Sequence, residues 1–169
     1  TAAGVFLSTN NGTSWASVGL TFAFIEALAL TGANLFAGTQ YYGVFLSVNN
    51  GTDWTAVNTG LAYVSAGALA VSGSNLFAGT TGGFFLSTDD GTSWTSSSTG
   101  LGNAYVTALA VNGANLFAGT ESYGVFLSTN NGTSWTAVNA GLTNAFVNTL
   151  VVNGTNLFAG TEGEGVLLS

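Results

Sequence analysis

The chain has 169 residues, seven of them acidic, and contains no Lys, Arg, His or Cys, so its formal net charge at pH 7 is −7. Without cations it lacks the groups that neutralise nucleic-acid phosphates, and an anionic membrane surface would repel it. Without His, Cys or Lys it lacks the usual general bases and nucleophiles of enzymes, and without thiols it forms neither disulfides nor thiolate metal sites. We therefore expect no enzyme activity, no cofactor and no nucleic-acid partner.

The first segment with a clear pattern is Gly4–Trp15, which reads GVFLSTNNGTSW. It predicts a short strand over Gly4–Ser8, a turn built on Asn and Gly, and another strand that begins at the tryptophan. After Leu20 comes an apolar run, and then NLFAGT over Asn34–Thr39, which predicts two further strands. Gly, Asn, Thr and Ser interrupt every apolar run well before it reaches the length of a membrane-spanning helix, so we expect no membrane insertion.

The same series then repeats to the end of the sequence. The GVFLS-to-Trp segment returns at Gly43–Trp54, Gly83–Trp94 and Gly124–Trp135, and a shorter copy reads GVLLS at Gly165–Ser169. NLFAGT returns at Asn75–Thr80, Asn115–Thr120 and Asn156–Thr161. The tryptophans Trp15, Trp54, Trp94 and Trp135 recur once per unit at almost even spacing. Each unit therefore contains four predicted strands, the first of them typified by Val106–Val111 and followed by an Asn112-Gly113 hairpin turn.

A four-stranded unit of about 40 residues is the size of one propeller blade. Because one such sheet has two apolar faces, it needs a neighbour on each side. The sequence predicts an all-β fold, a β-propeller or a segment of one, built of four-stranded antiparallel blades; a β-solenoid is the alternative, but its repeats are usually shorter. We expect one repeat domain over residues 1–169, with about four blades, starting and ending within a blade. Such an arrangement leaves an unpaired strand edge, which templates further pairing.

The turn segments resemble the Asp-box, or BNR repeat, whose pattern is S-x-[DN]-x-G-x-[ST]-W. The matching residues are Ser8, Asn10, Gly12, Trp15; Ser47, Asn49, Gly51, Trp54; Ser87, Asp89, Gly91, Trp94; and Ser128, Asn130, Gly132, Trp135. With the intervening repeats, the resemblance covers essentially the whole chain. It implies a propeller in which each box is a structural turn between the third and fourth strands, away from the ligand face.

The boxes depart from the family pattern at two places. Only Asp89 keeps the aspartate, and Asp53 stands where Ser or Thr is usual. Asn and Asp both bond to nearby backbone and tolerate left-handed geometry, so we expect the turns to form, with each Trp buried against the next strand. Sialidases also contain Asp-boxes, but they hold the substrate carboxylate with arginines, which this chain lacks.

In a propeller, the connections after the second strand and before the first strand share one face, the usual ligand face. The candidate ligand-binding residues on that face are Tyr41, Tyr42, Glu121, Tyr123, Glu162 and Glu164. Aromatic rings beside carboxylates could stack on sugars, and could equally be packing residues at the rim. No EF-hand or nonapeptide spacing is present, so we predict no metal site.

Two functions remain open from the sequence. Repetition, low charge and the lack of catalytic residue types favour a non-catalytic extracellular structural or interaction module: a surface, adhesive or filament-forming protein that binds copies of itself or further repeats. The alternative is a carbohydrate-binding propeller module of a larger glycan-active protein. The repeats also resemble tandem repeats of secreted or surface proteins of environmental bacteria, which implies an extracellular or cell-surface location.

Overall fold

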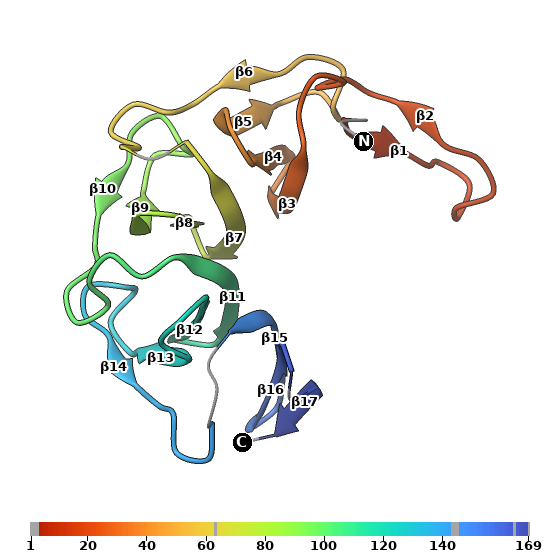
Figure 1. The fold of residues 1–169 in the computed structure, drawn as a ribbon. Helices are drawn as coiled ribbons and strands as arrows, with labels where there is room; N and C mark the ends of the chain where they lie inside the picture. The colour runs from red at the N-terminus through yellow and green to blue at the C-terminus, as the bar shows by residue number, and fades with distance from the viewer. Residues whose placement is uncertain (1–3, 63, 143–145, 164, 169) are drawn as a thin grey trace.

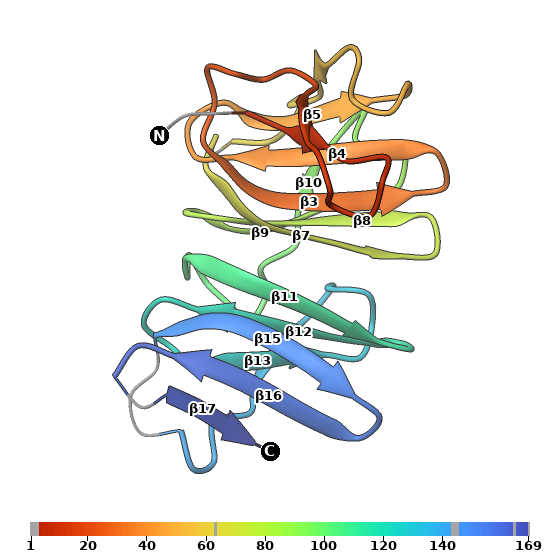
Figure 2. The same ribbon diagram turned by 90° about the vertical axis from the view of Figure 1, so that its right-hand side faces the viewer.

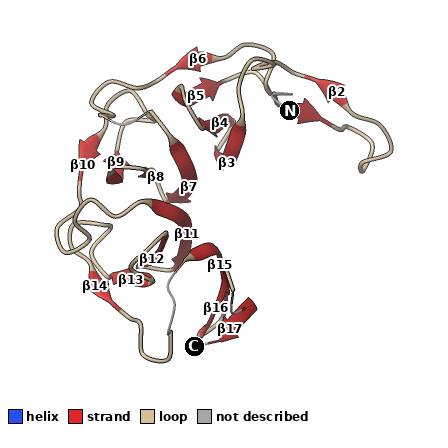
Figure 3. Cartoon of the chain, viewed as in Figure 1, coloured by secondary structure: helices blue, strands red, loops and turns tan. Residues whose placement is uncertain are grey.

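The computed structural model describes residues 4–62, 64–142, 146–163 and 165–168, in which the regular elements are all strands (Figures 1 and 3). Seventeen strands form five antiparallel sheets in chain order. Sheet 1 is β1 (Phe6–Leu7) and β2 (Ala16–Ser17); sheet 2 is β3 (Ile25–Thr31), β4 (Asn34–Thr39), β5 (Gly43–Ser47) and β6 (Thr55–Ala56). Sheet 3 is β7 (Ala66–Ser72), β8 (Asn75–Thr80), β9 (Gly83–Ser87) and β10 (Thr95–Ser96). Sheet 4 is β11 (Val106–Asn112), β12 (Asn115–Thr120), β13 (Val125–Ser128) and β14 (Thr136–Ala137); sheet 5 is β15 (Val147–Asn153), β16 (Asn156–Thr161) and β17 (Gly165–Leu168).

Sheets 2, 3 and 4 are the predicted four-stranded antiparallel units, so the all-β, blade-like prediction is confirmed. The first hairpin turn differs in one detail from the sequence prediction. Asn112 pairs with Asn115 as a strand residue, so the two-residue loop is Gly113-Ala114. Gly113 has a φ of 60°, which is the conformation that the first loop position of a type II′ turn requires.

The sheets pack face to face through their first strands. β3, β7, β11 and β15 follow one another along the inner side of the molecule (Figure 1). The glycine of the NLFAGT strand in sheets 2, 3 and 4 is what lets the next sheet come close: a Cβ at Gly79 would lie 2.5 Å from Val106 Cγ1, and one at Gly119 would lie 2.6 Å from Val147 Cγ1. Glycine inside a strand therefore marks a close inter-sheet approach here.

The core is divided among the spaces between successive sheets. Between sheets 2 and 3 it contains Phe36, Leu61 and Trp94, and between sheets 3 and 4 it contains Phe77 and Trp135 with their apolar neighbours. The stack forms an open arc, with sheet 1 at one end and sheet 5 at the other, and these ends lie apart in both views (Figures 1 and 2). The architecture is that of a β-propeller segment.

Four turns, which we call the box turns, connect the third and fourth strands: Ser8–Trp15, Ser47–Trp54, Ser87–Trp94 and Ser128–Trp135. In the third, the Ser87 hydroxyl donates to Asp89 Oδ1 at 2.8 Å and accepts the Gly91 N–H at 2.8 Å. Asp89 Oδ1 also accepts the backbone N–H of Ser93 at 2.9 Å. Asp90 has a φ of 54°, so the residue before the glycine is itself left-handed. Short side chains thus hold the turn closed.

The Asp53 departure has a structural explanation. In the third box turn, the Ser93 hydroxyl donates to Asp89 Oδ2 at 2.6 Å. In the second, the Asn49 amide Nδ2 donates to Asp53 Oδ2 at 2.8 Å. Donor and acceptor have exchanged positions, and the hydrogen bond is kept.

The tryptophans pack differently from the sequence prediction. Three of the four indoles lie against the preceding repeat: Nε1 of Trp54, Trp94 and Trp135 donates to the carbonyl oxygens of Val18, Val57 and Ser97 at 2.9, 2.7 and 3.0 Å. Trp94 and Trp135 are buried, whereas Trp15 is 65% exposed. Burial was therefore wrongly predicted for Trp15, because the described chain offers that indole no preceding repeat to pack on.

Candidate functional site

Two sets of connections meet at one edge of the sheets, opposite the box turns. In sheets 2, 4 and 5, the residue that follows the second strand donates its backbone N–H to the carbonyl oxygen of a residue just before the first strand of the same sheet. These bonds are Gln40 to Phe24 (3.1 Å), Glu121 to Tyr105 (3.0 Å) and Glu162 to Phe146 (2.9 Å). The structure therefore brings the candidate ligand-binding connections to a common side, which we call the loop edge.

A hollow of about 470 Å³ lies on the loop edge, where connections of sheets 2, 3 and 4 meet. Its lining residues are Gln40, Tyr41, Ala62, Val64, Ser65, Thr81 and Tyr105. Tyr41 is 58% exposed and packs edge-on against Phe24, with ring centroids 6.2 Å apart. The hollow therefore offers two phenol rings together with an amide and short hydroxyl side chains, which are the groups that contact sugars and other neutral polar ligands.

Tyr105 is the residue of this hollow whose pKa is shifted by its surroundings. Burial is the main cause that raises the pKa of its phenol, and the nearby carboxylates of Glu26 and Glu121 raise it further, while a hydrogen bond with Ser65 acts in the opposite direction. Glu26 is exposed as a whole residue, yet its carboxyl oxygen lies beside Gly67, and partial desolvation raises its pKa as well. Tyr105 is therefore a neutral phenol next to negative charge, able to donate a hydrogen bond.

The other candidate residues that the structure describes do not line this hollow. Tyr42 packs on Phe22, with ring centroids 5.4 Å apart. Tyr123 lines a separate hollow of about 370 Å³ between sheets 3 and 4. Glu121 and Glu162 are exposed beyond β12 and β16, and Glu164 lies outside the described residues. Of the five candidates that the structure describes, Tyr41 and Tyr123 therefore line two different hollows.

The sequence did not indicate some of the residues that complete the hollow. Ser65 and Thr81 are short polar residues in connecting segments, and nothing in their sequence context distinguishes them from other turn residues. Among the described residues, no three acidic side chains are grouped closely enough to hold a metal ion. In the same residues we find no helix of the length and apolarity needed to cross a membrane.

No protein-family model matches the chain, and no curated protein matches it in sequence. Solved structures are similar in fold. An ancestral GH74 enzyme is 24% identical, with a TM-score of 0.72, over 86% of this chain and 22% of that one. The extracellular domain of the one-component system BT4673 from B. thetaiotaomicron is 18% identical, with a TM-score of 0.79, over 99% of this chain and 25% of that one.

A third similar structure is the GH74 xyloglucanase from Xanthomonas campestris, which is 18% identical with a TM-score of 0.67 over 87% of this chain and 29% of that one. The chain thus spans about a quarter of the length of each of these three proteins. At these identities the likeness concerns the fold, and it shows that the stacked sheets are those of a β-propeller.

Proposed function

We propose that this chain is a non-catalytic structural and interaction module of an extracellular or cell-surface protein, and that its box turns are Asp-boxes. The observation that carries the proposal is the contact made by Trp94 and Trp135. Each repeat is a docking surface for the next, through one indole, one backbone acceptor and a shared apolar core. A chain built in this way is suited to binding further copies of the same unit.

The positions of the acidic residues also support a non-catalytic role. Asp53, Asp89 and Asp90 lie in box turns, away from the loop edge. Of the three described glutamates, Glu162 follows β16, whereas Glu26 in β3 and Glu121 after β12 both raise the pKa of Tyr105 and are therefore the pair that the assay below removes. Glycoside hydrolysis needs two carboxyl groups about 5–10 Å apart around one bond, with defined roles. The extracellular location is supported by the BT4673 domain, which is described as extracellular.

Incubation of the purified chain with xyloglucan and other β-glucans tests the absence of catalysis. We expect no reducing ends above the level of a Glu26→Gln, Glu121→Gln double variant. Hydrolysis by the unmodified chain that this double variant lacks would contradict the proposal.

A second candidate function is glycan binding at the hollow of about 470 Å³ on the loop edge. The exposed ring of Tyr41 beside Tyr105, Gln40 and Ser65 favours it. A glycan array followed by calorimetry tests this function. Binding that is lost in Tyr105→Ala and kept in Tyr123→Ala, a matched aromatic variant in the other hollow, would favour a glycan module over a purely structural one.

A further inference from the structure

Sheet 3 departs from the repeat at the loop edge. Two positions before the residue at which the first strand is bulged, sheets 2, 4 and 5 have an aromatic residue, whereas sheet 3 has Ser65. The aromatic residues are Phe24, Tyr105 and Phe146. Between NLFAGT and the third strand, sheet 3 has only Thr81-Gly82, one residue fewer than sheets 2, 4 and 5. A small side chain and a short connection therefore open the hollow of about 470 Å³ at this unit.

The bulge residue of the first strand also differs between units. It is Glu26 in sheet 2, Gly67 in sheet 3 and Thr107 in sheet 4, and each stands where the register of its strand pair shifts. A Cβ at Gly67 would lie 3.4 Å from the Glu26 carboxyl oxygen Oε2 and 3.5 Å from the Tyr105 hydroxyl. Glycine here thus leaves a space that a carboxyl group from sheet 2 and a phenol from sheet 4 both face. Because Tyr105 also lines the hollow, this space adjoins it.

The charge of the Glu26 carboxyl is not balanced within the described part of the chain. The sequence contains no basic side chain, and no hydrogen bond among the described residues reaches this carboxyl. Partial burial raises the pKa of Glu26, which means that its surroundings disfavour the carboxylate. A cation bound in the space at Gly67 would stabilise the charged form.

We propose that the hollow binds a small polar molecule with a primary ammonium group, which occupies the space at Gly67 between the Glu26 carboxylate and the Tyr105 hydroxyl. This inference rests on the second candidate function, binding at the hollow, and names the chemical class of the ligand. A primary ammonium has three N–H donors, and both oxygens can accept one. The body of the molecule lies in the hollow, against the exposed ring of Tyr41 and beside the polar side chains of Gln40 and Ser65.

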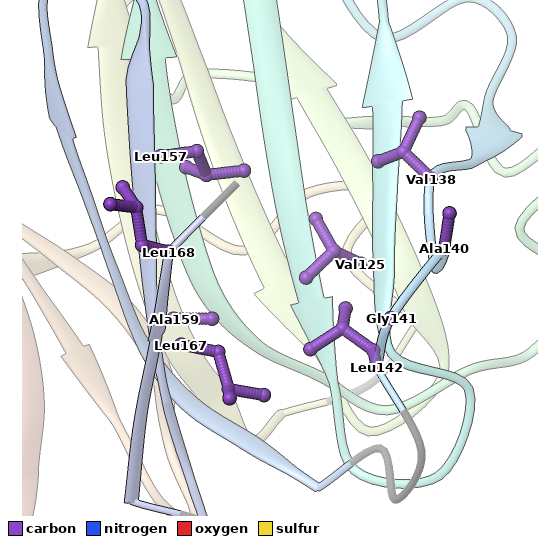
Figure 4. Close-up of a pocket in the computed structure, with 9 residues that line it drawn as sticks. All are labelled: Val125, Val138, Ala140, Gly141, Leu142, Leu157, Ala159, Leu167 and Leu168. Atoms are coloured by element: carbon purple, nitrogen blue, oxygen red, sulfur yellow. The ribbon is translucent and has the colours of Figure 1, made fainter.

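The size and the polarity of the hollow suit such a ligand. Its volume falls within the range of roughly 300–1,000 Å³ that is typical of small-molecule sites. A calcium ion takes about 6–8 oxygen ligands, whereas the space at Gly67 has one carboxyl group and one phenol facing it. The pocket of about 100 Å³ between sheets 4 and 5 is a useful contrast, because the side chains that line it, such as Val125, Leu142 and Leu157, are all apolar (Figure 4). That pocket has no polar side chain with which to orient a polar ligand.

Titration of the ¹⁵N-labelled chain with glucosamine, followed by NMR at about pH 6, tests the inference. Glucosamine carries a primary ammonium group at this pH, and glucose is the matched sugar in which a hydroxyl group replaces it. We expect glucosamine to shift the amide signals of Ser65, Gly67 and Tyr105 saturably, and glucose to bind at least ~10-fold more weakly, as for loss of a hydrogen bond to a charged group. Equal binding of the two sugars would overturn the ammonium site in favour of a neutral-glycan site. No response of these signals to glucosamine would overturn the inference as a whole.

Three variants separate the ammonium site from general effects of charge and folding. Glu26→Gln should weaken glucosamine binding at least ~10-fold, since it removes the charged partner. Glu162→Gln, which changes the net charge equally at an exposed residue of sheet 5, should bind as the unmodified chain does. Gly67→Ala fills the space beside Glu26 and should also weaken binding, while the amide signals of the box turn Ser87–Trp94 stay in place because the fold is kept.

Unchanged binding in Glu26→Gln, or an equal loss of binding in Glu162→Gln, would overturn the assignment of the ammonium partner. These titrations do not depend on the hydrolysis assay. Failure of the ammonium site is therefore distinguishable from failure of the proposed non-catalytic function.

Discussion

Trp135 Nε1 donates a hydrogen bond of 3.0 Å to the carbonyl oxygen of Ser97, in the preceding repeat. The backbone N–H of Trp135 donates a second one, of 2.9 Å, to Thr99. Trp94 repeats both contacts with Val57 and Thr59, at 2.7 and 2.8 Å. One residue therefore joins two sheets by hydrogen bonds and apolar packing, in a chain that has no basic side chain with which to form salt bridges.

Removal of such an indole should be costly. Trp94 is 4% exposed, so Trp94→Ala should reduce the free energy of unfolding by about 3–5 kcal/mol, as for other buried aromatic truncations. Tyr123→Ala, at a residue that is 60% exposed, should change it by less than about 1 kcal/mol. Urea unfolding of both variants checks this, and equal effects would mean that the box tryptophan is not an inter-sheet contact.

The strand glycines give a second prediction. Gly79→Ala places a methyl group 2.5 Å from Val106 Cγ1, so we expect a loss of about 1–3 kcal/mol from overpacking between sheets 3 and 4. Gly67→Ala, in the neighbouring strand, meets its nearest atom at 3.4 Å and should be neutral or slightly stabilising. Thermal unfolding compares the two, and a silent Gly79→Ala would contradict the packing described for β8 and β11.

Because donor and acceptor are exchanged in the second box turn, we predict that substitutions at Asn49 and Asp53 have coupled effects on the free energy of unfolding. Asn49→Asp would place a carboxylate against Asp53, so we expect a loss of about 0.5–1 kcal/mol at this exposed site. Asp53→Ser in the same chain should restore stability, because it recreates the Asp89–Ser93 arrangement. A double-mutant cycle measures the coupling, and additivity of the two changes would refute it.

Asp89 makes the stability of the third box turn depend on pH. Hydrogen bonds, first from the Ser93 hydroxyl and then from the Ser93 backbone and Ser87, hold the pKa of Asp89 below its ordinary 3.8. The folded chain then binds fewer protons than the unfolded chain just below pH 3.8, so this stabilisation is present above that pH and is lost as pH falls through the lowered pKa. Relative to Asp89→Asn, whose amide fits the same turn, the unmodified chain should lose stability on acidification from pH 5 to 2. A constant difference across that range would contradict the hydrogen bonding.

The parts of the fold that depend on residues close together in the sequence were predictable, and the parts that depend on distant residues were not. Strand positions and box turns depend on residues a few positions apart, such as Ser87 with Asp89 and Gly91, so the sequence predicts them closely. The partner of each tryptophan lies one whole repeat away in another sheet, as with Trp94 and Val57, and the one-unit pattern did not reveal it. The exposure of Trp15 depends on that long-range contact, and so it was mispredicted.

The candidate sites were less predictable, because they depend on which loops become neighbours. Tyr41 was identifiable as an aromatic residue in a connection at the loop edge. Its place beside Ser65 and Thr81 follows from the packing of sheet 2 on sheet 3, which composition does not encode.

Hydrogen exchange of the four indole N–H groups, followed by NMR at high and low protein concentration, tests the inter-sheet role of the box tryptophans most directly. The account predicts slow exchange at both concentrations for Trp54, Trp94 and Trp135, whose N–H groups are bonded to the preceding repeat. It predicts fast exchange at both concentrations for Trp15, whose indole is 65% exposed. Exchange at Trp94 and Trp135 as fast as at Trp15 would contradict it.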